Sequence, residues 1–73
     1  MKFMIAVFKS RKEAIEFGTM MGRYGARVSA VNTPPSISSA CGLSVKFKRS
    51  DLYKAQRALA GGDYFTFKGF YEV

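Results

Sequence analysis

The stretch FMIAVFKSRKEAIEFGTMMGRYG, residues 3–25, decides how the fold begins. Its first six residues are all apolar, which is typical of a strand buried on both faces. Ser10 and Glu13 have the spacing of a capping box, in which the serine hydroxyl accepts from the N–H of residue 13 and the glutamate reaches back to the N–H of residue 10. We therefore expect a strand over 3–8 and a helix over 11–24 that ends at a left-handed Gly25.

This first helix has one apolar face, because apolar residues and glycines recur at a spacing of three or four. Such a stripe predicts a surface helix that packs one side against a sheet. The residues that share the stripe are Ala14, Ile15, Phe17, Gly18, Met21 and Tyr24.

Two further strands follow, separated by an unusually long connection. Residues 26–31 alternate as a second strand, and Pro34-Pro35 prevents regular strand from continuing. Residues 43–47 alternate again and predict a half-buried strand. The connection over 32–42 is about ten residues long, whereas a plain hairpin needs two to five.

The last third of the chain predicts a second helix and a fourth strand. Ser50 is the expected N-cap and Asp51 favours the first turn. Leu52, Ala55 and Leu59 give this helix a short apolar stripe, which Gly61-Gly62 ends. The aromatic segment 63–73 is the expected last strand.

The resulting order, β-α-β-β-α-β, predicts a single α+β domain over residues 1–73 with a ferredoxin-like sandwich: a four-stranded antiparallel sheet with two helices on one face. The helices should meet Leu43, Val45 and Phe47 of the third strand. The helical residues expected to make this contact are Ile15, Phe17, Met21, Leu52 and Leu59.

Composition limits the function of this chain of 73 residues. It has no His, which excludes acid–base catalysis by an imidazole. It has one Cys, which excludes an internal disulfide and metal sites made of several cysteines. We therefore expect a carrier or binding protein without a cofactor or metal rather than a self-contained enzyme. A lone thiol fits the reducing cytoplasm, and the apolar run 3–8 is too short for a signal peptide or membrane span.

The long connection contains the strongest candidate for chemistry, Cys41. A cysteine there can act as a thiolate nucleophile, or it can be a small buried hydrophobe at the start of a strand. Ser38 and Ser39 offer hydrogen-bond donors, Gly42 lets a partner approach the backbone closely, and Lys46 can favour the thiolate by its charge.

The segment VNTPPSISSACGL, residues 31–43, closely resembles the hallmark segment of a small bacterial family described as selenium/sulfur carrier protein-like. Members carry a proline, an Ile-Ser pair and a Cys-Gly that leads into a strand; here these are Pro35, Ile37, Ser38, Cys41 and Gly42. The resemblance implies that Cys41 carries sulfur or selenium as a persulfide or perselenide. It also implies a donor protein and an acceptor protein as partners.

Two other interpretations remain open from the sequence. The net charge of +7 and the element order suit a small RNA-binding module, although only Phe47 of the third strand is aromatic. The other interpretation is a regulatory or assembly module without chemistry. We also expect a homodimer through the helix-free face of the sheet, because an exposed apolar patch usually marks an interface. The patch is expected to include several of Met4, Ala6, Phe8, Tyr64 and Phe70.

Overall fold

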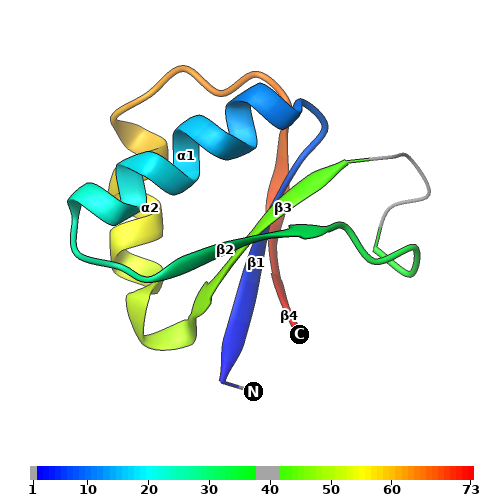
Figure 1. Cartoon of the computed structure of the whole chain (residues 1–73), viewed down its shortest axis with the longest axis horizontal. Coiled ribbons are helices and arrows are strands. Elements are labelled where there is room, and N and C mark those ends of the chain that lie inside the picture. The colour runs from blue at the N-terminus through cyan, green and yellow to red at the C-terminus, as the bar shows by residue number, and fades with distance from the viewer. Residues whose placement is uncertain (1, 38–41) are drawn as a thin grey trace.

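The computed structural model describes residues 2–37 and 42–73 and has a four-stranded antiparallel sheet with two helices on one face (Figure 1). The ferredoxin-like order is as predicted. Neither helix of the described residues is long and apolar enough to cross a membrane. The elements are β1 (Phe3–Phe8), α1 (Arg11–Arg23), β2 (Val28–Asn32), β3 (Leu43–Lys48), a 3₁₀ turn (Arg49–Asp51), α2 (Leu52–Ala60) and β4 (Phe67–Glu72).

The sheet has the order β2-β3-β1-β4, so β1 and β3 are its central strands. Ala6 of β1 lies opposite Val45 of β3 on one side and Phe70 of β4 on the other. All of β1 after Phe3 is buried, which confirms the prediction of a strand covered on both faces.

The core lies between the sheet and the helices, and Phe8 is at its aromatic centre. The Phe8 ring centroid lies 5.1 Å from that of Phe17 on α1, 5.4 Å from that of Phe67 on β4 and 5.6 Å from that of Tyr64. Tilted and edge-on pairs of this kind contribute about 0.5–1.5 kcal/mol each beyond the burial of their area. Met21 of α1 is also buried in this layer.

The apolar patch predicted for the helix-free face does not form, because the β1 side chains assigned to it point toward the helices. Met4, Ala6 and Phe8 lie beneath the helices with the buried side chains of β3, and Tyr64 and Phe70 pack against the same core. Phe3, Ile5 and Val7 are the β1 side chains of the helix-free face. The homodimer stays a prediction, without the patch on which it was based.

The helical contacts are confirmed except at Ile15, whose side chain is 57% exposed. Phe17 and Met21 are buried, and Leu52 and Leu59 pack against the core from α2. Ile15 lies at the edge of the apolar arc, above the groove between α1 and the edge strand β2. β2 has no strand outside it in the described sheet, so nothing from the sheet covers this side chain.

Several predicted boundaries are wrong. The last strand starts at Phe67 instead of residue 63, because Tyr64 turns its ring into the core. The second strand is Val28–Asn32 instead of 26–31. Ser50 is not an N-cap: it lies within the 3₁₀ turn, and no side-chain cap bond precedes α2.

The ends of α1 follow the sequence signals, with one change of partner. The N–H of Glu13 donates to Ser10 Oγ at 3.3 Å, as the capping box predicts. The Glu13 carboxylate, however, does not reach back to Ser10. It accepts from both the N–H and the Oγ1 hydroxyl of Thr66, each at 2.9 Å, while Thr66 Oγ1 accepts from the Ser10 N–H at 3.0 Å. At the other end, Gly25 has φ +87° and ends the helix as predicted.

Thr66 therefore ties the start of α1 to the segment that leads into β4. Its backbone N–H lowers the pKa of Glu13, because the hydrogen bond favours the charged carboxylate; partial burial opposes this shift and the Thr66 hydroxyl adds to it.

We expect Glu13→Gln to be less stable than the native chain at neutral pH. Because the pKa of Glu13 is lower in the folded state, its charge stabilises the fold fully above the ordinary value of 4.5. This stabilisation is lost as the pH falls through the folded-state pKa. The difference in unfolding free energy between the two proteins should therefore shrink toward acid pH, as measured by urea denaturation at neutral pH and near pH ~3.

The control is Glu16→Gln, which removes the same charge one helical turn on. Within the described residues no hydrogen bond holds Glu16. Two results contradict the bond between Glu13 and Thr66 as a source of stability. One is a loss of unfolding free energy in Glu13→Gln that is constant across this pH range, and the other is a loss equal to that of Glu16→Gln.

Candidate functional site

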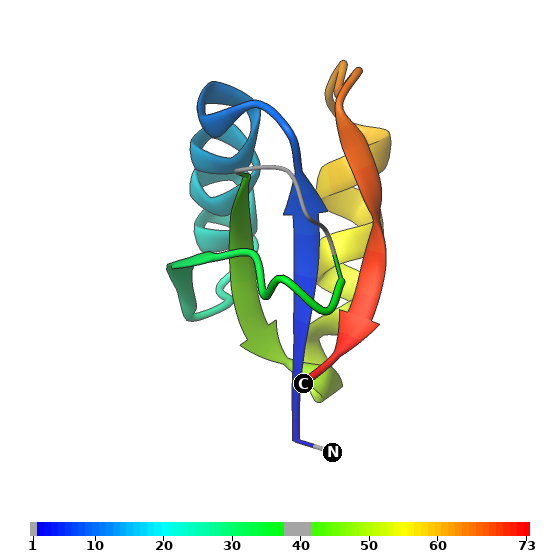
Figure 2. The same ribbon diagram turned by 90° about the vertical axis from the view of Figure 1, so that its right-hand side faces the viewer.

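The described part of the connection between β2 and β3, residues 33–37, folds over the face of the sheet that the helices leave uncovered. Figure 2 shows the described segment after β2 passing in front of β3 and β1. Beneath this end of the sheet, Val7 and Ser44 are buried although both belong to the helix-free face. The predicted half-buried strand is therefore covered on both faces at its start.

The two ends of the connection are joined by hydrogen bonds at its base. The N–H of Thr33 donates to the Gly42 carbonyl at 3.3 Å. The hydroxyls of Thr33 and Ser44 lie 2.7 Å apart, and both side chains are buried. A buried hydroxyl left without a partner costs about 1–3 kcal/mol, so this pair fixes the geometry at which the chain leaves β2 and enters β3.

Gly42 lies where no side chain fits. A Cβ at this position would come within 2.8 Å of the Phe8 carbonyl oxygen and 3.4 Å of Thr33 Oγ1. The base of the connection therefore packs directly on the end of β1, and the backbone of residue 42 is held against that strand. This packing is a structural reason for a glycine after Cys41, in addition to the access that the sequence suggests.

The residues of the predicted site are partly described. Pro35 and Ile37 lie in a turn that the Ile37 N–H closes by donating to the Pro34 carbonyl at 2.9 Å. The Pro35 side chain is exposed and that of Ile37 is half-buried. The predicted carrier Cys41 and its neighbours Ser38 and Ser39 lie outside the described residues.

Lys46 lies on the helix-free face between Ser29 of β2 and Ile5 of β1. Its ammonium group is 4.7 Å from the centre of the Phe3 ring. Since Phe3 is at the opposite end of β1 from the Gly42 contact, the side chain extends away from the base of the connection. Its role in stabilising a thiolate stays a prediction.

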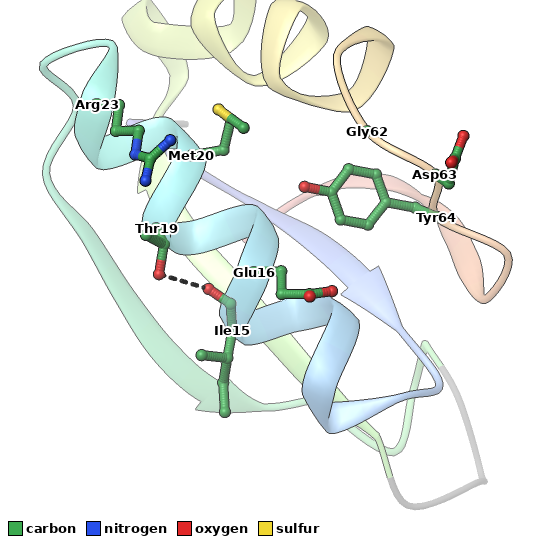
Figure 3. A pocket seen from close by; sticks show the side chains of 8 residues that line it. All are labelled: Ile15, Glu16, Thr19, Met20, Arg23, Gly62, Asp63 and Tyr64. Atoms are coloured by element: carbon green, nitrogen blue, oxygen red, sulfur yellow. Dashed lines mark hydrogen bonds between the residues drawn. The ribbon is translucent and has the colours of Figure 1, made fainter.

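A separate cavity of about 460 Å³ lies between α1 and the segment after α2 (Figure 3). Tyr64 points across it toward α1, and Glu16 and Arg23 line the helix side. Burial raises the pKa of the Tyr64 hydroxyl, and the nearby Glu16 and Glu13 charges add to the rise. None of the residues that line this cavity belongs to the connection over 33–42.

Sequence reasoning missed Thr33 and Ser44. Ser44 alternates with apolar neighbours and so has the pattern of a solvent-facing strand residue. Only the long connection, which has more residues than a hairpin needs, could have indicated that something covers it. Within the described residues no three His, Cys, Asp or Glu side chains gather as a metal site would require.

The fold and the closed connection define a small ferredoxin-like protein with its only cysteine in the segment between two bonded ends. The chain belongs to the family described as "Putative Se/S carrier protein-like", whose family model matches residues 3–72. This confirms the resemblance found in the sequence. No protein of curated function matches the chain.

We expect Gly42→Ala to destabilise the fold by about 1–3 kcal/mol, the usual cost of overpacking, because the added methyl meets the backbone oxygen of Phe8. Because this oxygen belongs to the backbone of the central strand β1, it cannot move aside as a flexible side chain would. Chemical denaturation of the purified variant gives the unfolding free energy.

Gly22→Ala is the matched control. Nothing lies within 4 Å of a Cβ at Gly22, which is in α1, so this variant should equal the native chain or exceed its stability by up to about 1 kcal/mol. If Gly42→Ala is as stable as Gly22→Ala, the packing of residue 42 on β1 is not a constraint.

Proposed function

We propose that the protein carries sulfur or selenium on Cys41 and passes the atom from a donor protein to an acceptor protein. The observation that carries this proposal is membership of the selenium/sulfur carrier-like family over residues 3–72. Cys41 is the chain's only thiol, so a covalent chalcogen carried by cysteine has a single possible position.

The loading step is an exchange that needs no outside oxidant or reductant. The Cys41 thiolate attacks the outer sulfur of a donor persulfide, R–S–SH. A new bond forms between Cys41 Sγ and that sulfur, the donor S–S bond breaks, and the donor leaves as the thiolate R–S⁻. A donor that carries R–S–SeH gives the perselenide by the same step. An acceptor nucleophile then attacks the outer atom, and Cys41 is released as the thiolate.

The surroundings of the cysteine support this use. The connection is fixed at its base by the Thr33 and Gly42 backbone bond, and Gly42 is packed on β1. The predicted donors Ser38 and Ser39 can stabilise a persulfide anion by hydrogen bonds. A chain without His needs no general base here if the thiol is already ionised, which the net charge of +7 favours.

In this proposal the chain is a carrier and not a self-contained catalyst. The donor and acceptor proteins supply the activation and the final chemistry, and the carrier holds one atom between them. The proposed compartment is the reducing cytoplasm, where a free thiol persists.

We expect the native chain, treated with inorganic polysulfide and then desalted without reductant, to gain the mass of one sulfur atom in intact mass spectrometry. The Cys41→Ser variant should gain nothing. The thiol should also react with iodoacetamide at a pH below the ordinary cysteine value of about 8.5, since transfer requires the thiolate.

Ser38→Ala with Ser39→Ala is the informative companion variant, because it keeps the thiol and removes the proposed donors. It should still accept sulfur but lose it faster to a small-molecule thiol. A native chain that keeps its unmodified mass, or a thiol that reacts only far above this value, contradicts the carrier proposal.

A further inference from the structure

The helix-free face has a second end, away from the connection, that remains open. Here Phe3 and Tyr71 are large exposed residues, 38% and 37% exposed, on β1 and β4. A cleft of about 290 Å³ lies beside Phe3. Its lining residues are Phe3, Arg27, Val28, Ser29, Lys46, Phe47 and Lys48.

The cleft combines the exposed ring of Phe3 with three cations, while Phe47, which also lines it, has its side chain in the core. Strand alternation places Lys46 and Lys48 on the same face as Phe3, and Arg27 lies just before β2 at the same end. None of the lining residues is acidic. Glu72, the carboxylate of the neighbouring β4, is paired with Arg49 at 3.5 Å and does not neutralise these cations.

We propose that this cleft, defined by Phe3, Arg27, Lys46 and Lys48, binds single-stranded nucleic acid. Phosphates would pair with the cations, and one base would stack on the Phe3 ring. The Lys46 ammonium group lies 4.7 Å from the centre of the Phe3 ring, so this ring face is open to a ligand-sized group. A base can take the place of the ammonium group on the ring, and the ammonium group can then pair with a phosphate.

Single strands fit this surface better than a duplex does. Only an unpaired base exposes a face that an aromatic side chain can stack on. The volume of the cleft is just below the ~300–1,000 Å³ typical of ligand sites, so it has room for no more than one nucleotide unit, with the rest of the strand along the sheet. An acidic peptide could meet the cations, but it would not use the Phe3 ring.

This surface differs from the RNA-binding pattern that the sequence suggested. Phe47, the aromatic residue noted on the third strand, has its side chain in the core beneath the helices. The exposed rings come from the outer residues of β1 and β4 instead. The inference is independent of Cys41, since the cleft lies at the other end of the face from Gly42.

The test is fluorescence anisotropy of a labelled oligouridine RNA, with an oligothymidine DNA of equal length as the second probe. We expect binding to both, or a preference for one that identifies the natural strand. Because about 0.7 counterion is released per phosphate contact on a single strand, three contacts predict a log–log salt slope near −2 between about 50 and 200 mM salt.

Phe3→Leu should weaken binding about tenfold with little change in the salt slope, and Phe3→Tyr should retain native affinity, because base stacking needs the ring. Combining Arg27→Gln, Lys46→Gln and Lys48→Gln should remove the slope. The combined control Lys12→Gln, Arg23→Gln and Arg57→Gln, on the exposed sides of the helices, lowers the net charge equally and should bind nearly as the native chain.

Circular dichroism spectra identify variants that fail to fold. Three results overturn the proposal: no binding at low salt, equal losses for the cleft and helix triple variants, or equal affinity of Phe3→Leu and the native chain. Competition by a polyglutamate peptide as effective as that by unlabelled oligouridine also overturns it, since a cleft specific for charge alone does not recognise a base. Cys41→Ser should bind as the native chain.

Discussion

The structure depends on covering β1, a central strand with apolar side chains on both faces. Met4, Ala6 and Phe8 need the helices above them, while Ile5 and Val7 need cover on the opposite face. At about 25 cal/mol for each Å² removed from water, leaving either set exposed would be a large loss for so small a chain. Two helices can cover only one face of this sheet. The neighbouring strands and the segment after β2 therefore supply the rest of the cover (Figure 2).

This need explains why the connection between β2 and β3 is long and why its base is so constrained. It must cross the sheet, bury the Thr33 and Ser44 hydroxyls as a pair and bring Gly42 against the Phe8 carbonyl. The same constraint fixes where the segment with the single cysteine is attached. Gly42, which packs on the core strand β1, is thus the direct neighbour of the cysteine proposed to carry the atom.

The helix-free face consequently has two different ends. The described segment after β2 crosses the end at Val7 and Ser44, and the end at Phe3 is open and basic. A polyanion bound at the open end would lie on the same side of the sheet as the described segment that follows β2.

Local signals in the sequence determined the order of the elements, the burial of residues 4–8, the capping of α1 by Ser10 and its end at Gly25. These depend on neighbours within a few residues, so pattern and spacing suffice. The cysteine-bearing segment was also recognisable from its residues alone. Only the tertiary structure decided which face each β1 side chain takes, because a strand that is apolar throughout has no alternation to read. It likewise decided that Glu13 bonds Thr66, 53 residues away, that Ser44 is buried, and that Phe3 and Lys46 share a cleft with Arg27. Each of these is a contact between segments distant in sequence, and no local pattern encodes the partner.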